Sequence, residues 1–286
     1  MKNISVGIVG LGLIGASFAK GFKEKEPSVK VYAANRTKSV LDKALAEKAI
    51  DGILDEETIP CCDLIILGLY PELCVRFLED QKALISEGCI VTDVCGTKGY
   101  ICEEGFRIAR ENNFSFIGGH PMAGTQFSGY DHSSADMFEG ASMILVPEKK
   151  DDPDIERIKV MLAPLGFGMF ALTDAAEHDR IIAYTSQMAH VLANAYIKSP
   201  TLESSKGFTG GSFRDMTRVA YLNPGMWTEL FMANRTNLID EIGITIDNLS
   251  KVRDALKDSD PDKLYKLLEE GSRRKEESLN EQNNNS

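Results

Sequence analysis

The feature that most constrains the fold of this chain is a glycine-rich turn near its start. Residues 10–15 read GLGLIG, a GxGxxG pattern between the apolar run Ile4–Val9 and the helical pattern Leu13–Lys23. A strand, a turn of this kind and a helix in direct succession are typical of domains that bind dinucleotides. The sequence therefore predicts a Rossmann-type site for NAD or NADP in the first part of the chain.

Each position of this turn has a physical role in such a site. Gly10 permits the tight turn, Gly12 lets the backbone approach a diphosphate, and Gly15 lets the helix pack closely on the strand. Leu13 and Ile14 begin the helix, where backbone N–H groups and the positive end of the helix dipole face the diphosphate. We therefore expect these five residues to bind the cofactor.

Short apolar runs alternate with amphipathic stretches over the first 172 residues. The apolar runs predict strands at Ile4–Val9, Lys30–Ala34, Leu64–Leu69, Ile90–Thr92, Phe114–Ile117, Ser142–Val146 and Met169–Leu172. Helical patterns lie between many of them, at Leu13–Lys23, Ser39–Glu47, Glu72–Leu84 and Asp152–Leu162. This alternation predicts the α/β class, with a Rossmann-type, doubly wound and mostly parallel sheet.

The pattern changes after Thr173. Helical periodicity covers Asp174–Lys198, Asn223–Leu249 and Asp262–Glu270, and β-branched runs disappear. We therefore expect a dinucleotide-binding domain over residues 1–172 and an all-helical C-terminal domain over residues 173–286. The last residues, NEQNNNS, are polar and predict a disordered tail.

Composition excludes several classes of function. The net charge is −11, which disfavours nonspecific binding to nucleic acid. No apolar run approaches the ~18 residues that span a bilayer, and the start MKNISVGIVG does not resemble a signal peptide. Six cysteines without a CxxC pattern predict reduced thiols and no metal site. We expect a cytoplasmic protein that binds neither a metal nor a membrane.

The end of the second predicted strand bears on the choice of cofactor. An acidic residue at this point would bind the ribose hydroxyls of NAD. This chain instead has Asn35, Arg36 and Thr37. An arginine can pair with a 2′-phosphate and a threonine can donate a hydrogen bond to it. NADP is therefore favoured slightly over NAD, although NAD could still bind through Asn35.

A histidine follows the predicted strand Phe114–Ile117. It is His120, in the segment GGHPMAG at residues 118–124. Ligands bind at the carboxyl ends of strands in such sheets, and a histidine held there can act as a general base. Taken alone, it could equally be a structural or merely exposed side chain.

Four segments together resemble the prephenate/arogenate dehydrogenase family. They are GIVGLGLIG near the start, GGHPMAG, HDRIIAYTSQMAHVLANA at residues 178–195, and GGSFRDMTRVAYLNPGMWTELF at residues 210–231. The resemblance spans both expected domains, and the last segment has no generic Rossmann explanation. It implies oxidation of the ring alcohol of prephenate, with hydride passing to NAD or NADP, and loss of the ring carboxylate as carbon dioxide. The product would be 4-hydroxyphenylpyruvate, made in tyrosine biosynthesis.

The resemblance also implies roles for individual residues. His120 matches the family's catalytic histidine and would take the proton of the substrate hydroxyl. Arg218 matches the arginine that binds a substrate carboxylate, and its planar fork suits that task. His190 matches a second histidine near the substrate, with Ser186 four residues earlier on the same helix. His178 would have a supporting or capping role.

One loop departs from the family pattern. Where the family often has Asp-x-Gly-Ser-x-Lys, this chain reads DVCGTK at residues 93–98, so that Gly96 occupies the serine position. Thr97 either supplies the missing hydroxyl or leaves that substrate contact absent. Lys98 could help to attract an anionic substrate. Asp215, three residues before Arg218, is expected to orient that arginine or to pair across a subunit interface.

Alternatives remain open at the level of sequence. Arogenate, which carries an ammonium in place of the keto group, would give tyrosine directly. A β-hydroxyacid or 6-phosphogluconate type of dehydrogenase would use a lysine in the helical domain, and residues 174–197 contain none. A sensor that binds NAD(P) without turnover would be favoured if His120 or Arg218 were missing. The resemblance further implies a homodimer, with substrate binding and dimerisation in the helical domain.

Overall fold

One mixed sheet organises the first part of the chain. The computed structural model describes residues 4–125 and 127–284. The strands are β1 (Ser5–Val9), β2 (Lys30–Ala34), β3 (Gly52–Ile53), β4 (Leu64–Leu67), β5 (Ile90–Asp93), β6 (Ser115–Pro121), β7 (Ser142–Pro147) and β8 (Met169–Leu172). Their order in the sheet is β3-β2-β1-β4-β5-β6-β7-β8. Strands β1 to β6 are parallel, whereas β7 is antiparallel to β6 and β8 is parallel to β7.

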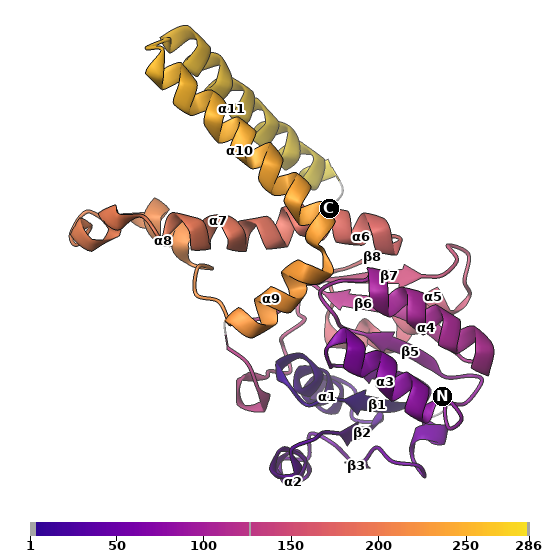
Figure 1. The fold of residues 1–286 in the computed structure, drawn as a ribbon. Coiled ribbons are helices and arrows are strands. Elements are labelled where there is room, and N and C mark those ends of the chain that lie inside the picture. Colours follow the sequence, from indigo (N-terminus) through magenta and orange to yellow (C-terminus); the bar gives the residue numbers. More distant parts are fainter. Residues whose placement is uncertain (1–3, 126, 285–286) are drawn as a thin grey trace. The chain divides into compact units, whose positions relative to one another are not determined.

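Helices cover both faces of this sheet, as expected for a doubly wound fold (Figure 1). They are α1 (Leu13–Lys25), α2 (Lys38–Ala46), α3 (Pro71–Gln81), α4 (Gly99–Asn112) and α5 (Asp154–Leu162). Helices α1, α2 and α5 contribute to one hydrophobic cluster, and α3 and α4 to the other. From β1 the strands continue along the chain towards β3 on one side, and from β4 towards β8 on the other. In such sheets, ligands bind at the carboxyl ends of the two strands where this direction changes, here β1 and β4.

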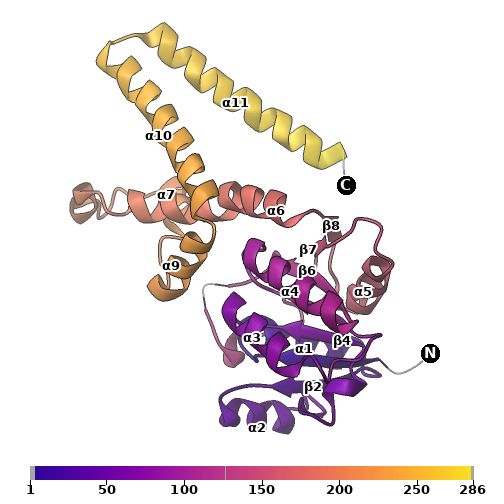
Figure 2. The same ribbon diagram turned by 45° about the vertical axis from the view of Figure 1, so that its right-hand side comes forward.

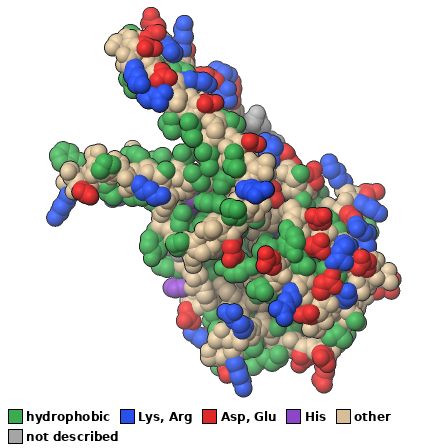
Figure 3. All heavy atoms as spheres, in the orientation of Figure 1, with side chains coloured by type: hydrophobic (Ala, Val, Ile, Leu, Met, Phe, Trp, Pro, Cys, Tyr) green, Lys and Arg blue, Asp and Glu red, His purple; other side chains and the backbone are tan. Residues whose placement is uncertain are grey.

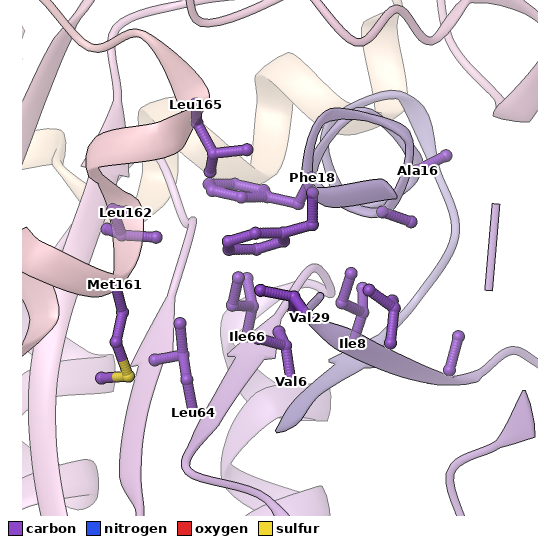
Figure 4. Packing of buried hydrophobic residues seen from close by; sticks show 14 of the residues in the cluster. Val6, Ile8, Ala16, Phe18, Val29, Leu64, Ile66, Met161, Leu162 and Leu165 are labelled. Atoms are coloured by element: carbon purple, nitrogen blue, oxygen red, sulfur yellow. The ribbon is translucent and has the colours of Figure 1, made fainter. Parts of the chain in front are cut away.

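The central strands are mostly apolar because both of their faces are buried. In β4, Leu64 and Ile66 point into the cluster of α1 and α5, and Ile65 and Leu67 point into the cluster of α3 and α4. This alternation follows from the two-residue period of a strand. Figure 4 shows the first cluster, with Phe18 of α1 above the side chains of β1 and β4.

The chain becomes helical after β8. Helix α6 (Ala175–Ile182) continues through a π-helical segment (Ala183–Gln187) into α7 (Met188–Tyr196), and α8 (Gly211–Thr217) and α9 (Pro224–Ala233) follow. Short 3-10 helices lie at Ile59–Cys61, Tyr130–His132, Ala163–Leu165 and Pro200–Ser204. One compact unit ends at Asn234. The second is a helical hairpin of α10 (Arg235–Lys257) and α11 (Pro261–Asn284) (Figure 2).

The structure corrects several sequence expectations. The helix expected over Asn223–Leu249 is interrupted at Asn234, whose buried amide donates to the carbonyl of Asp179 at 2.7 Å and to the side chain of Gln187 at 3.0 Å. Strand β6 extends beyond Ile117, because its last residues pair with β7. Strand β3 and helix α4 had no expected counterpart.

The polar tail also differs from expectation. Helix α11 continues to Asn284, where composition predicts disorder, and residues 285 and 286 lie outside the described residues. Ion pairs one turn apart support this helix, with Arg273 next to Glu277 and Arg274 next to Glu270. Within the described ranges, no helix combines the length and the apolar character that a membrane span requires.

The packing of Phe18 yields a prediction about stability. Its ring is fully buried, with its centroid 4.2 Å from that of Phe138. Replacing Phe18 with alanine should lower the free energy of unfolding by about 3–5 kcal/mol, because a large cavity would remain. Urea denaturation measures this loss. The control Phe127→Ala, at a ring that is 53% exposed, should cost about 0.5 kcal/mol or less. Equal losses would contradict the assigned core.

Candidate active site

The glycine-rich turn lies at the carboxyl end of β1, next to the end of β4. Gly10 has a φ of +93°, and a Cβ atom there would lie 2.6 Å from the carbonyl oxygen of Gly68. A Cβ at Gly15 would lie 2.0 Å from the carbonyl oxygen of Gly10. In contrast, a Cβ at Gly12 would meet nothing within 4 Å. Two of the glycines are therefore required by packing, and the third faces open space where a ligand can approach the backbone.

The start of α1 is suited to an anion. Gly12 is the N-cap residue, no side chain caps the helix, and its first turn has no acidic residue. The first N–H groups of a helix lack partners within that helix, and here no side chain competes for them. The turn, with Leu13 and Ile14 opening the helix, therefore fits the diphosphate of a dinucleotide.

Asn35 has an internal role at the end of β2. Its Oδ1 accepts a hydrogen bond from the backbone N–H of Leu11 at 3.0 Å, and its Nδ2 donates to the carbonyl of Thr37 at 3.2 Å. Both polar ends of the amide are therefore used to hold the glycine-rich turn. Arg36 and Thr37 are exposed, and Arg36 forms no ion pair within the described chain. The described surface here is cationic.

A buried ion pair joins β5 to β6. Lys98 and Asp93 are fully buried and in direct contact. The Lys98 ammonium also donates to the carbonyl of Gly119 at 2.7 Å, and Asp93 accepts from the N–H groups of Cys95 and Gly119. These bonds fix the backbone immediately before His120. Contrary to expectation, Lys98 does not present its ammonium to a ligand, because Asp93 and the Gly119 carbonyl bind it inside the protein.

His120 lies near the carboxyl end of β6 and contacts a second histidine. Its Nδ1 is 2.9 Å from Nε2 of His178, and Nδ1 of His178 is 2.7 Å from Oδ1 of Asp179. Asp179 also accepts from the backbone N–H groups of Lys98 and Gly99 at 2.7 and 2.9 Å. The side chains thus form a continuous chain from the start of α4 to His120.

The surroundings keep His120 neutral. Burial lowers the pKa of His120 well below its usual value, and the charge of Lys98 and the neighbouring His178 lower it further. All three effects disfavour the imidazolium form. The ring is therefore available as a proton acceptor over a wider pH range than an exposed histidine would be.

The loop that carries Gly96 packs against α9. A Cβ at Gly96 would lie 3.1 Å from Cδ2 of Leu230, so a serine there would press on this helix. Thr97 is buried next to it, and its hydroxyl has no hydrogen-bond partner within the described protein. Tight packing by Leu230 gives a physical reason for glycine at this position.

A second cluster surrounds His190 on α7. Its Nδ1 is 3.1 Å from the carbonyl oxygen of Val219, and its ring centroid is 3.8 Å from that of Trp227. Burial lowers the pKa of His190, against the opposing effect of the Val219 carbonyl, and the nearby charge of Arg218 lowers it further. Trp227 also lines a pocket of about 400 Å³ with other residues of α7, α9 and the segment before α9. This volume is within the range of small-molecule sites.

Arg218 is exposed and lies just beyond the end of α8. No ion pair joins it to Asp215 among the residues described, so the expected pairing within one helix does not form. Ser186 is half-buried in the π-helical segment, which alters its angular relation to His190 from that of a regular helix. The structure thus brings Arg218 near His190 and leaves its guanidinium open to solvent.

Sequence reasoning underestimated His178 and Asp179. Both lie in the first turns of α6, far along the chain from His120, and no spacing rule relates them to it. The adjacent His-Asp pair was the only signal available. The contact with His120 arises because α6 starts directly after β8 and packs against α4.

The buried ion pair makes a prediction about stability. Replacing Lys98 with methionine would leave the Asp93 carboxylate buried without its cation, which typically costs about 3–5 kcal/mol. Urea unfolding of Lys98→Met measures this cost. The control Lys159→Met removes a lysine whose Glu156 partner on α5 is largely exposed, and should cost less than about 1 kcal/mol. Similar costs in the two variants would argue against a structural role for the buried pair.

Two family models match this chain. Residues 18–169 match the family model for the nucleotide-binding domain of prephenate dehydrogenase, and residues 174–270 match that for its dimerization domain. The chain is 28% identical to prephenate dehydrogenase of Lactococcus lactis subsp. cremoris over 279 residues, which cover 93% of this chain and 75% of the relative.

Solved structures of similar proteins have the same fold. The arogenate dehydrogenase of Synechocystis superposes with a TM-score of 0.82 at 26% identity, covering 96% of this chain and all of the other. Prephenate dehydrogenase from A. aeolicus, in complex with hydroxyphenyl propionate and NAD+, superposes with a TM-score of 0.83 at 26% identity, covering 97% and 99% of the two chains. The two matched models together with this fold show that the chain belongs to the prephenate dehydrogenase family of oxidoreductases.

Proposed function

We propose that this protein catalyses the oxidative decarboxylation of prephenate to 4-hydroxyphenylpyruvate. The observation that carries the proposal is the position of a neutral, internally hydrogen-bonded His120 at the same edge of the sheet as the glycine-rich turn. The A. aeolicus relative, whose structure contains NAD+ and a hydroxyphenyl compound, supports this substrate class. A bound nicotinamide supplies the hydride acceptor for oxidation of the ring alcohol.

His120 acts as the base in this proposal. Its Nδ1 faces His178, so Nε2 is the ring nitrogen left to meet the substrate hydroxyl. A neutral imidazole there can accept the hydroxyl proton as hydride leaves the same carbon. Loss of the ring carboxylate as carbon dioxide then makes the ring aromatic.

Other residues bind the substrate. Arg218 pairs with one of its two carboxylates; its guanidinium is exposed and has no ion-pair partner in the described part of the chain, which suits this role. His190 lies beside Arg218 and contacts the side-chain end of the substrate, with Ser186 contributing from the preceding π-helical segment. Thr97 is buried and its hydroxyl has no partner among the described residues, so it is free to replace the serine absent at Gly96.

Arogenate is the second candidate substrate, and the bonding of His190 favours it. The Val219 carbonyl can only accept, so Nδ1 of His190 carries the proton and Nε2 of the neutral ring is an acceptor. An acceptor suits the ammonium of arogenate better than the keto group of prephenate. The similarity to the Synechocystis arogenate dehydrogenase is compatible with this alternative.

NADP is the proposed preferred cofactor. Both polar atoms of the Asn35 side chain are hydrogen-bonded to the protein backbone, and no carboxylate at the end of β2 would repel a 2′-phosphate. Arg36 is exposed and has no ion-pair partner among residues 4–125 and 127–284, and Thr37 precedes α2 without using its side chain as a cap. These features suit a phosphate better than two ribose hydroxyls.

We also propose a functional division at residue 172, with residues 173–286 serving for substrate binding and homodimer formation. The match of residues 174–270 to a dimerization domain supports it. Figure 3 shows hydrophobic side chains gathered over the helical arm of α7 and α8, whereas acidic and basic groups are mixed over the Rossmann part. The exposed apolar residues of this arm include Tyr196, Phe208, Met216 and Tyr221.

Initial rates with prephenate and arogenate, each with NAD and NADP, test the proposed activity and cofactor. We expect turnover of prephenate, with NADP preferred. Arg36→Ala should raise the KM for NADP about 10- to 100-fold, as loss of a charge-assisted bond implies, and leave the KM for NAD unchanged. Arg273→Ala, at an arginine paired with Glu277 on α11, is the control. Absence of turnover with all four pairs, in protein that binds cofactor, would reject the activity.

His120→Gln tests the proposed base. The variant should lower kcat about 10²- to 10⁴-fold and leave binding of NADP unchanged. Because the pKa of His120 is lowered, its neutral form persists below the ordinary histidine value of 6.5. The kcat/KM of the unmodified protein should therefore fall only at a pH below 6.5, and this acid limb should be absent from the residual activity of the variant. An unchanged acid limb would assign the titration to another group.

A further inference from the structure

We infer that His178 and Asp179 are positioning residues that fix the tautomer of His120, with Nδ1 protonated and Nε2 left as the acceptor. The inference rests on the proposed role of His120 as the base, and it deepens that role. It depends on the directions of the hydrogen bonds, which run in one sense along the chain Asp179–His178–His120.

Asp179 sets this direction. Its Oδ1 accepts from the N–H of Lys98 at 2.7 Å and its Oδ2 accepts from the N–H of Gly99 at 2.9 Å. A backbone N–H can only donate, so both oxygens act as acceptors, as in an ionised carboxylate. The contact of 2.7 Å between Oδ1 and Nδ1 of His178 must therefore have the hydrogen on the histidine.

His178 transmits the direction. In its neutral form an imidazole carries one hydrogen; with that hydrogen on Nδ1, Nε2 of His178 is an acceptor. His178 is 1% exposed, so its ring is shielded from bulk solvent. The contact of 2.9 Å with His120 then requires the hydrogen on Nδ1 of His120. The lone pair of His120 consequently lies on Nε2.

The hydrogen bonds from His120 through His178 to Asp179 also stabilise the product of proton transfer. When Nε2 of His120 takes the hydroxyl proton, the ring becomes an imidazolium that still donates from Nδ1 to His178. The charge of Lys98 opposes the imidazolium, and Asp93 is already paired with Lys98. Asp179, reached through His178, is the carboxylate left to balance the new charge.

The tautomer can be measured without substrate. The chain has four histidines, so ring-¹⁵N labelling gives few signals. Long-range ¹H–¹⁵N spectra above the ordinary histidine pKa of about 6.5 should show Nδ1 of His120 protonated and Nε2 unprotonated. His120→Gln and His132→Gln assign the signals. In His178→Leu, which removes the acceptor, His120 should change to a mixture of tautomers. A wild-type His120 with its hydrogen on Nε2 would overturn the inference.

Kinetics provide a second readout. His178→Leu should lower kcat roughly 100-fold or more, as misorientation of a catalytic imidazole does, with KM for prephenate changed less than about threefold. His178→Gln places an amide oxygen as acceptor, so its kcat should be at least about tenfold higher than that of His178→Leu. His132→Gln, at an exposed histidine, should match the unmodified protein. Equal kcat in the Leu and Gln variants, both folded by circular dichroism, would reject the positioning role.

The outcomes separate this inference from the proposed function. If the protein turns over neither prephenate nor arogenate, the proposed activity fails, whereas the tautomer of His120 remains measurable and still tests the inference. If turnover is normal and His178→Leu retains full kcat, the activity stands and the positioning role is rejected.

Discussion

The buried contact between Asp93 and Lys98 is the interaction on which the proposed catalytic site depends. It joins the end of β5 to the backbone of β6 at Gly119, one residue before His120. The backbone that follows Lys98 begins α4, and Asp179 binds its first N–H groups. Through these bonds one short loop holds β5, β6, α4 and α6 together. Separating Asp93 from Lys98 would leave an uncompensated charge in the interior, which is costly. The two side chains, and the backbone bonded to them, are therefore held in place.

The distribution of charge explains how an acidic protein can bind anionic ligands. The chain has a net charge of −11, yet the described residues that we propose to bind cofactor and substrate include unpaired positive groups. The uncapped start of α1 provides a partial charge, and Arg36 and Arg218 provide full charges that no carboxylate neutralises within the described chain. Lys98 differs, because its charge is spent on Asp93 and acts at short range to keep His120 neutral. For the binding of anions, the position of each positive group therefore matters more than the net charge of the protein.

The proposed site combines groups from distant parts of the sequence. His120 comes from β6 and His178 from the start of α6, whereas His190 lies twelve residues further along the same helical run, about 18 Å along its axis at 1.5 Å per residue. The two histidines of this run thus belong to different clusters. His178 supports the ring that we propose as the base, and His190 lies with Arg218 and Trp227. One helical run supplies groups to both.

The amino-acid sequence was sufficient for the Rossmann sheet, the glycine-rich turn, the helical second half and the candidates His120 and Arg218. The sheet, the turn and the helical half follow from local patterns, namely a two-residue or helical period and the GxGxxG spacing, whereas Arg218 and the catalytic role of His120 follow from the resemblance to the family. Tertiary structure was needed for the links between His120, His178 and Asp179, for the internal use of Asn35 and Lys98, and for the close contact of Gly96 with Leu230. The physical reason is that each of these contacts joins residues from separate elements, and their distances depend on how the elements pack.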